Sequence, residues 1–312
     1  MDRHEIPLDS VRAPIVNAGR FGILPDATPS SAPTMNALQP MLDAAQAAAR
    51  QAGALIRAAA ADPGALQVRA KQPNDYVTQV DLASEQAIVR TLLGAFPGHA
   101  VRSEESAQAH GTPGADCVWI VDPLDGTTNF IHGYPAYAVS IALAVRGRVE
   151  LGVVLDVGRD ELFHATLGGG AYANGQRLAV AGRVELRDAV VASSCPPRAG
   201  PGFAVSMALL GTVLQHAHAL RRSGSAALDL AWVAAGRCDA QFDLGLNAWD
   251  VAAGGLLVRE AGGVVSSFRG QADYIESREC LAGNPALHTA LGAILAPYAS
   301  SRPSAPGGGV QN

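Results

Sequence analysis

The sequence predicts an α/β fold, in which helices and strands alternate along most of the chain. Two patterns support this prediction. Long segments carry apolar residues at i, i+3 and i+4, as amphipathic helices do, whereas shorter apolar runs are bounded by glycine, proline or asparagine, as strands are. The composition agrees, because 48% hydrophobic and 16% charged residues among 312 are typical of a globular protein with a sizeable core. A chain of this length can form one large domain or two modest ones.

The first part of the chain contains two predicted helices and a series of predicted strands. Residues 1–34 lack sustained periodicity and are expected to form a flexible arm, although Met35 could equally be the true start. A helix is predicted from Asn36 until Asp62-Pro-Gly stops it, and an extended stretch follows from Lys71 to Asp81. The remaining elements are a helix at 81–95 and strands at 100–102, 118–121, 137–145, 149–155, 161–166 and 171–172.

The second part begins near Ala189 and is predicted to alternate in the same way. Its expected elements are strands at 190–193, 239–242, 264–266 and 281–282 and helices at 203–217, 226–235, 251–261 and 287–298. The tail at 300–312 is rich in Pro and Gly and is expected to be disordered. We therefore expect one folded domain over 35–299, with halves of about 35–188 and 189–299.

Charge, hydropathy and cysteine usage argue against several classes of protein. The net charge is −5 and no basic run occurs, so direct nucleic-acid binding is not expected. No apolar stretch reaches the length that spans a bilayer, so no membrane association is expected. The four cysteines lack C-x-x-C spacing and the N-terminus lacks a secretory apolar region, which predicts reduced thiols in a cytoplasmic protein without formally excluding disulfides. The eight histidines show no zinc-ligand spacing.

The chemistry is predicted to centre on residues 119–130, W-I-V-D-P-L-D-G-T-T-N-F. The apolar run that opens this segment predicts a buried strand, and Asp122 and Asp125 follow where that strand should end. Two carboxylates suit a hard cation such as Mg²⁺, while the backbone amides from Gly126 onwards and the hydroxyls of Thr127 and Thr128 suit a phosphate group. The segment therefore predicts a Mg²⁺-dependent site for a phosphate ester. The simpler alternative is that both acids cap a turn and a helix.

Three further acids lie at junctions between apolar elements and loops, and these are Asp81, Glu104 and Asp250. A cluster of carboxylates is unfavourable unless cations occupy it, so divalent metals would stabilise such a set. Each acid also has a simpler interpretation. Asp81 and Asp250 could cap helices, and Glu104 with Glu105 could form a solvated pair.

Four segments resemble, in order, the motifs of the inositol monophosphatase family, and most closely its bacterial inositol-1-monophosphatase subgroup. The matching segments are 75–81, 104–106, 122–130 and 247–263, within a resemblance that extends from about Met41 to Tyr298. It implies the layered αβαβα sandwich shared by inositol monophosphatase and fructose-1,6-bisphosphatase. The two acids of the central motif are one residue further apart than in the D-x-D-x-T string of haloacid dehalogenase-type phosphatases. This spacing favours an activated water over an aspartyl-phosphate intermediate.

The resemblance implies a role for each acid. Two Mg²⁺ ions, with a third and weaker one near Glu104, would be held by carboxylates and one backbone carbonyl. The implied metal ligands are Glu104, Asp122, Leu124 through its carbonyl, Asp125 and Asp250. The implied catalytic residues are Asp81, Thr127 and Glu104, because Thr127, hydrogen-bonded to Asp81, would position the attacking water and help to deprotonate it. Inhibition by Li⁺ and a homodimer are also implied.

The substrate implied by the resemblance is a small phosphorylated polyol, above all myo-inositol 1-phosphate. The residues expected to contact it are Glu104, Leu124, Asp125, Gly126, Thr127, Gly224, Ser225, Ala226, Asp243 and Asp250. Asp243 departs from the pattern, since inositol phosphatases usually carry Glu there and the shorter side chain would reach less far. The alternatives are a related phosphatase acting on histidinol phosphate, fructose 1,6-bisphosphate or adenosine 3′,5′-bisphosphate, and a partner protein of the RNA-synthesis machinery that retains the phosphatase site.

Overall fold

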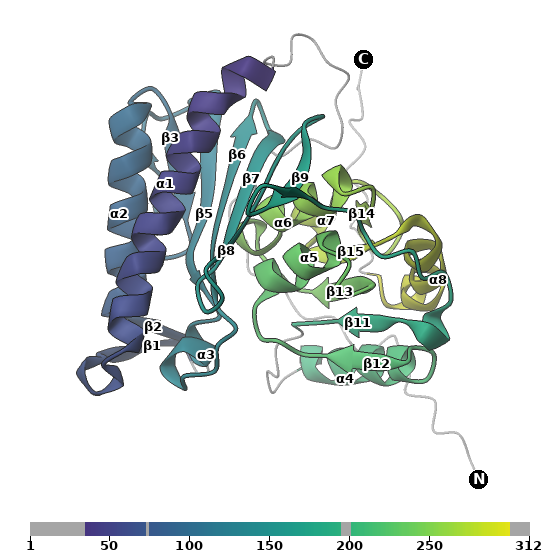
Figure 1. Ribbon diagram of the computed structural model, residues 1–312. Coiled ribbons are helices and arrows are strands. Elements are labelled where there is room, and N and C mark those ends of the chain that lie inside the picture. The colour runs from purple at the N-terminus through teal and green to yellow at the C-terminus, as the bar shows by residue number, and fades with distance from the viewer. Residues whose placement is uncertain (1–34, 73–74, 195–200, 300–312) are drawn as a thin grey trace, which may run out of the picture.

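A larger and a smaller β-sheet lie on either side of a pair of helices, and further helices cover the outer faces of both sheets (Figure 1). The computed structural model describes residues 35–72, 75–194 and 201–299. Within these ranges, the layers in order are α1 (Met35–Ala60) with α2 (Gln79–Ala95), an eight-stranded sheet, α5 (Ala226–Ala234) with α6 (Ala248–Glu260), a five-stranded sheet, and α4 (Pro201–Leu214) with α8 (Pro285–Leu295). This order is an αβαβα sandwich, so the predicted fold class is confirmed.

The first outer layer packs against the larger sheet through short side chains. Four alanines of α1 at helical spacing, Ala45, Ala48, Ala49 and Ala52, are fully buried, which lets the helix lie close to its neighbours. The strands of this sheet are β3 (Ala100–Ser103), β4 (His110–Gly111), β5 (Cys117–Asp125), β6 (Ala138–Val145), β7 (Arg148–Asp156), β8 (Glu161–Thr166), β9 (Gly170–Ala173) and β10 (Gln176–Arg177). They pair in the order β10-β9-β8-β7-β6-β5-β3-β4, antiparallel except for β3 and β5.

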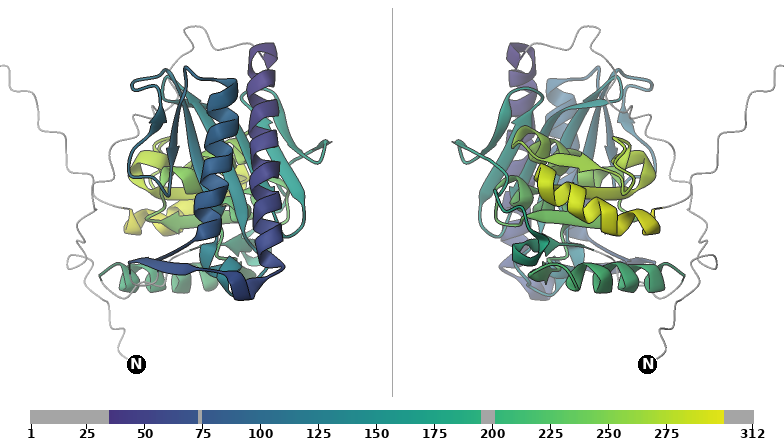
Figure 2. Two further views of the ribbon diagram at one scale, coloured as in Figure 1. Left: turned by 90° about the vertical axis from the view of Figure 1, so that its left-hand side faces the viewer. Right: turned by 90° about the vertical axis from the view of Figure 1, so that its right-hand side faces the viewer.

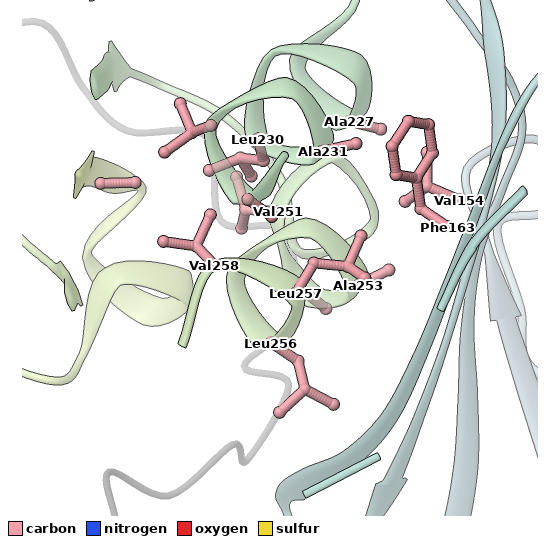
Figure 3. Close-up of a cluster of buried hydrophobic side chains, with 14 of the residues drawn as sticks. Val154, Phe163, Ala227, Leu230, Ala231, Val251, Ala253, Leu256, Leu257 and Val258 are labelled. Carbon is pink, nitrogen blue, oxygen red and sulfur yellow. The ribbon is translucent and has the colours of Figure 1, made fainter. Parts of the chain in front are cut away.

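The middle layer fills the space between the two sheets with apolar side chains. Leu230 of α5 and Val251 and Leu257 of α6 lie in one buried cluster with Val154 and Phe163 of the larger sheet (Figure 3). Complete burial of each such side chain stabilises the fold by about 1.5–3 kcal/mol relative to exposure. Because α6 belongs to this core, its first turn, which carries Asp250, is held rigidly.

Gly152→Ala is expected to lower the free energy of unfolding by about 1–3 kcal/mol, because it overpacks the contact between β7 and α6. An added Cβ would lie 2.7 Å from the carbonyl oxygen of Ala253 and 2.9 Å from its Cα. These are backbone atoms of α6, which cannot move aside individually. Urea unfolding of the variant and the wild type measures the effect.

The matched control is Gly94→Ala in α2, where an added Cβ meets nothing within 4 Å. Alanine there is expected to raise the free energy of unfolding by about 0.5–1 kcal/mol, because glycine loses more backbone entropy on folding. An equal response of the two variants would show that α6 does not press on β7.

The smaller sheet carries the second outer layer. Its strands are β11 (Val190–Ala192), β12 (Ala219–Arg221), β13 (Ala240–Leu244), β14 (Val264–Ser266) and β15 (Glu279–Gly283). They pair in the order β12-β11-β13-β15-β14, with the first three parallel and β15 antiparallel to both neighbours. Leu209 and Val213 of α4 pack with Leu287 and Leu291 of α8 on its outer face (Figure 2).

Several predicted elements differ at their ends. The stretch predicted to be extended from Lys71 to Asp81 is extended only as far as Thr78, where β1 (Val68–Gln72) and β2 (Asp75–Thr78) pair with each other, and α2 begins at Gln79. Some short elements were not predicted, because they contain too few residues to show a hydrophobic period. They are α3 (Thr127–Ile131), α7 (Tyr274–Ser277), β4, β10 and β12. The helix predicted at 203–217 ends at Leu214, and the last predicted helix is α8 followed by a 3₁₀ turn at Ala296–Tyr298.

Some predictions fall outside the described residues, namely those on the arm and the tail. The division into two halves stays a prediction. Cys117, Cys238 and Cys280 are free thiols, and Cys195 lies outside the described part of the chain. None of the helices in the described ranges is long and apolar enough to cross a membrane.

Candidate active site

A bulge at the end of β5 places the two acids of the central motif on one face of the sheet. Asp122 and Asp125 are three positions apart, so a regular strand would point them to opposite faces. Asp122 pairs with Ser140 of β6 and Asp125 pairs with Ala138, so β5 has one more residue than β6 between these pairs. The sequence predicted that the strand would end before Asp122, but it continues through both acids. Asp122 is buried, and its Oδ1 accepts a hydrogen bond of 3.0 Å from the Leu124 N–H.

The predicted pair of Thr127 and Asp81 is formed across 46 residues of sequence. The Thr127 hydroxyl oxygen lies 3.0 Å from Asp81 Oδ1 and 3.1 Å from the Leu124 carbonyl oxygen, and its single hydrogen can be donated to only one of them at a time. Asp81 Oδ2 accepts from the N–H and hydroxyl of Thr78, at 2.8 and 2.5 Å, in a capping box at the start of α2. Burial raises the pKa of Asp81, and the hydrogen bonds from Thr78 and Thr127 oppose that rise.

Two glycines let the start of α3 meet the loop before α5. Gly126 has φ of +91°, and a Cβ there would lie 2.9 Å from the Ala136 carbonyl oxygen. Gly224 has φ of +86°, and its Cβ would lie 2.8 Å from Asn129 Nδ2. Asn129 Nδ2 donates to the carbonyl oxygens of Ala136 and Ser223, at 2.6 and 2.8 Å. Sequence reasoning missed Asn129 as the residue that joins these loops, although its place within the central motif was a usable signal.

The start of α5 fixes the orientation of Asp125. The Ser225 hydroxyl donates to Asp125 Oδ2 at 2.7 Å, and the Ala227 N–H donates to the same oxygen at 2.8 Å. Ser225 also caps α5 by accepting from the Leu228 N–H. Ser225 and Ala226 were predicted as substrate contacts, and that role stays a prediction. The structure shows that Ser225 holds an acid of the central motif.

Glu104 and Asp250 complete the acidic cluster from two other elements. Glu104 follows β3, and its N–H donates to the Val121 carbonyl oxygen at 3.1 Å. Asp250 lies in the first turn of α6, where its Oδ2 accepts from the Asn247 N–H at 2.6 Å. The charges of both residues act on Asp122. The four acids predicted to bind metal are therefore brought together.

Burial and mutual repulsion raise the pKa values of these acids. The pKa of Asp122 lies well above its usual range because of burial first and then the charges of Glu104, Asp125 and Asp250. Burial and the charges of Asp125 and Glu104 do the same to the pKa of Asp250. Burial raises the pKa of Asp125 to about 6, although its hydrogen bonds from Ser225 and Ala227 counteract the rise. The cluster therefore resists full ionisation when no cation is bound.

Comparison with known proteins agrees with this arrangement. The family model of the inositol monophosphatase family matches residues 37–300. The chain belongs to the inositol monophosphatase family. It is 46% identical over 264 residues to the Nus factor SuhB of Pseudomonas aeruginosa, which covers 84% of this chain and 97% of that relative. It is also 46% identical over 226 residues to an inositol-1-monophosphatase of Mesorhizobium japonicum, with 72% of this chain and 85% of the relative covered.

A solved structure of the same family supports the fold. The extragenic suppressor protein suhB of Bartonella henselae superposes with a TM-score of 0.79 at 40% sequence identity, over 82% of this chain and 98% of that one. The family resemblance that the four motifs indicated is therefore confirmed. The roles of individual residues in this inositol monophosphatase homologue stay predictions.

The acidic cluster of this family member fits Mg²⁺ in its chemistry. Carboxylate and carbonyl oxygens are the ligands that this cation prefers, and a positive charge would relieve the repulsion among the acids. In the described ranges, however, no group of three or more His, Cys, Asp or Glu side chains is arranged to hold a metal ion. Backbone N–H groups of Leu124, Ala227 and Asn247 each donate to one oxygen of Asp122, Asp125 and Asp250, and such hydrogen bonds fix the orientation of these carboxylates.

Asp243, the residue that departs from the family pattern, points into the protein. It lies on β13 and is 1% exposed, with Oδ1 accepting from the Ser193 hydroxyl at 3.1 Å and Oδ2 accepting from the side-chain amide of Gln241. Burial raises the pKa of Asp243 to about 7. Asp229 of α5, which sequence reasoning missed, is also buried and accepts from the Ser194 hydroxyl at 2.8 Å. A substrate hydroxyl would have to compete with these internal donors for Asp243.

Proposed function

We propose that this protein is a Mg²⁺-dependent phosphatase that hydrolyses a small phosphate monoester, with myo-inositol 1-phosphate as its substrate. The observation that supports the proposal is the convergence of four acids beside the hydrogen-bonded pair of Thr127 and Asp81. The proposed ligands of two to three Mg²⁺ ions are Glu104, Asp122, the Leu124 carbonyl, Asp125 and Asp250. When bound, Mg²⁺ would lower the pKa of water and neutralise charge that develops on the phosphoryl and leaving groups.

Thr127 and Asp81 are suited to orient the attacking water and to receive its proton. When Thr127 donates its hydrogen to Asp81 Oδ1, the lone pairs of its oxygen can accept a hydrogen bond from the water. Because burial raises the pKa of Asp81, this carboxylate is a better base than an exposed aspartate. The water oxygen then bonds to phosphorus in line as the bond to the ester oxygen breaks, and the alkoxide that leaves on the opposite side takes a proton from solvent to become the alcohol. The amides of Gly126 and Thr127 are proposed to bind phosphate oxygens.

The leaving alcohol is proposed to face the start of α5 and the end of β13, where Gly224, Ser225, Ala226 and Asp243 lie. Inositol phosphate is favoured because a relative at 46% identity is an inositol-1-monophosphatase. A cytoplasmic location, a homodimer and inhibition by Li⁺ stay predictions from the family resemblance.

A panel of phosphate esters tests the proposal. Phosphate release is measured for myo-inositol 1-phosphate, histidinol phosphate, fructose 1,6-bisphosphate and adenosine 3′,5′-bisphosphate. We expect kcat/KM to be roughly tenfold higher for the inositol ester, a ratio that hydrogen bonds to an alcohol can supply. A chelator should remove the activity, and added Mg²⁺ should restore it. Activity that persists in the chelator would contradict the metal requirement, and a higher kcat/KM for another ester would reassign the substrate.

A second function is favoured by one specific comparison. A relative that is 46% identical and covers 84% of the chain is a Nus factor, a name that points to transcription. We therefore propose, as the alternative, that the chain is a protein partner of the RNA-synthesis machinery; direct nucleic-acid binding remains unexpected at a net charge of −5. An inactive Asp122→Asn variant separates the two functions. If this variant rescues a deletion strain, the partner function is the main one. If the variant is folded and does not rescue the strain, catalysis is the main function.

A further inference from the structure

The turn that carries Glu104 is anchored on both of its sides. Upstream, the Glu104 N–H donates to the Val121 carbonyl oxygen, which ties the end of β3 to β5. Downstream, β4 returns antiparallel to β3, so residues 104–109 form the connection between the two strands. His110, the first residue of β4, closes this connection, because its Nε2 lies 2.9 Å from the Ser106 hydroxyl oxygen. The second anchor has no part in the chemistry proposed above.

Glu85 of α2 is the other partner of His110. Its Oε1 lies 3.9 Å from His110 Nε2, a contact that is an ion pair only when the histidine carries a proton on both ring nitrogens. The Glu85 residue is 6% exposed, and in the described part of the chain Oε1 has no hydrogen-bond partner. A buried carboxylate is costly unless a donor or a cation faces it. Glu85 therefore favours a hydrogen on His110 Nε2, and that nitrogen then donates to the Ser106 hydroxyl.

The position of Glu85 connects this anchor with the rest of the site. Glu85 follows Asp81 by four residues in α2, so the two side chains lie on the same face of the helix, one turn apart. Asp81 accepts from Thr127, and Glu85 faces His110. Helix α2 packs against β3 as well as β5, as its place beside them in Figure 1 indicates. One helix thus supports both Thr127 and the turn of Glu104.

We propose that Glu85 and His110 are positioning residues for Glu104. They hold the 104–106 turn through Ser106, so that the Glu104 carboxylate is presented to Asp122 and to the bound metal. The part of this inference that concerns metal rests on the proposed function. The part that concerns the turn does not, because it can be measured in the metal-free protein.

His110→Ala is expected to raise the Mg²⁺ concentration at half-maximal activity roughly tenfold, as loss of an outer partner of a metal ligand does, with kcat at saturating Mg²⁺ little changed. His110→Gln should restore most of the affinity, because its amide N–H can reach Ser106. Glu85→Gln should give a smaller increase, and the double variant of His110→Ala and Glu85→Gln should be no worse than His110→Ala alone, because the two residues act through one contact.

Two measurements besides activity distinguish the parts of the proposal. Calorimetric titration with MgCl₂ gives the affinity directly. Hydrogen exchange in the metal-free protein reports on the amides of residues 104–106, which should exchange several-fold faster in His110→Ala while the free energy of global unfolding is unchanged. The matched control is His216→Ala, because His216 is exposed in the turn after α4 and its ring nitrogen Nδ1 contacts the carbonyl oxygen of Thr212 in that helix, 2.8 Å away.

Each outcome decides one part. Wild-type exchange rates at 104–106 in His110→Ala would overturn the positioning role, whatever the enzyme does. Faster exchange with an unchanged Mg²⁺ affinity would also overturn it, because His110 would then hold the turn without any effect on metal binding by Glu104. Absence of Mg²⁺ binding to the wild type would overturn the proposed function, and the exchange rates alone would then decide whether His110 and Glu85 hold the turn.

Discussion

Asp122→Asn is expected to lower kcat/KM by about 10²- to 10³-fold, the equivalent of several kcal/mol of transition-state stabilisation by metal. The same change should raise the unfolding temperature of the metal-free protein. Asp122 is buried, and the charges of Glu104, Asp125 and Asp250 raise its pKa, so a neutral side chain of the same shape removes repulsion from the folded state. Phosphate release and thermal unfolding in chelator measure the two effects.

The pH dependence of unfolding tests separately whether Asp122→Asn stabilises the metal-free protein. Because the pKa of Asp122 is higher in the folded than in the unfolded state, the folded state binds more protons between these two values, and stability falls as pH rises through them. The gain from Asp122→Asn should therefore be largest at alkaline pH and should shrink as the pH falls through the raised pKa of Asp122, because the wild-type side chain then becomes neutral as well. Addition of Mg²⁺ should stabilise the wild type and not the variant.

The matched control for this variant is Asp116→Asn, just before β5. Asp116 is 66% exposed and pairs with Arg146 at 3.0 Å, a surface contact that contributes about 0–1 kcal/mol. It should change neither activity nor the Mg²⁺ response. Wild-type activity in Asp122→Asn would remove this residue from the metal site, and a lower unfolding temperature without metal would show that its charge is compensated within the protein.

The acids of the site could be predicted from the sequence because each lies at a junction between an apolar element and a loop. An apolar run that stops just before Asp122 and a helix that begins near Asp81 or Asp250 are local patterns, and element ends are where a rigid scaffold presents side chains. The fold class followed from the same patterns and from the order of the motifs. What the sequence did not show is the bulge in β5, because strand register depends on the partner strand, here Ser140 and Ala138.

The contacts that hold the acids in place could not be predicted from the sequence either, because they join residues of different elements. Ser225 reaches Asp125 across 100 residues, and Glu85 faces His110 from a different element. A serine before a helix predicts a cap, which Ser225 also is, and nothing local indicates its second partner. Asp243 illustrates the opposite case, since the sequence suggested a substrate contact, whereas the structure adds internal donors from Ser193 and Gln241 that compete for it.

Asp81→Asn is expected to lower kcat by about 10²- to 10⁴-fold, the range that general-base catalysis contributes, without weakening Mg²⁺ binding. Asp81 Oδ1 is 3.0 Å from the Thr127 hydroxyl, whereas Asp81 is not among the proposed metal ligands. Asparagine can still accept from Thr78 through its one carbonyl oxygen, so the capping box at the start of α2 can persist. Its amide cannot take a proton, so the water loses its base. Steady-state kinetics at saturating Mg²⁺ and calorimetric titration with MgCl₂ measure the two quantities.

Two substitutions of Thr127 test whether its hydroxyl is needed for the step in which Asp81 acts as the base. Thr127→Ser keeps the hydroxyl and should retain most of kcat, whereas Thr127→Val keeps the shape, removes the hydroxyl and should lose activity as Asp81→Asn does. The double variant of Asp81→Asn and Thr127→Val should be hardly worse than either single variant, because residues that act as a unit are not additive. If Thr127→Val were active and Asp81→Asn were not, Asp81 would act on the water directly. If both kept wild-type kcat, the proton would leave through another group and the pair would serve only to join α3 to α2.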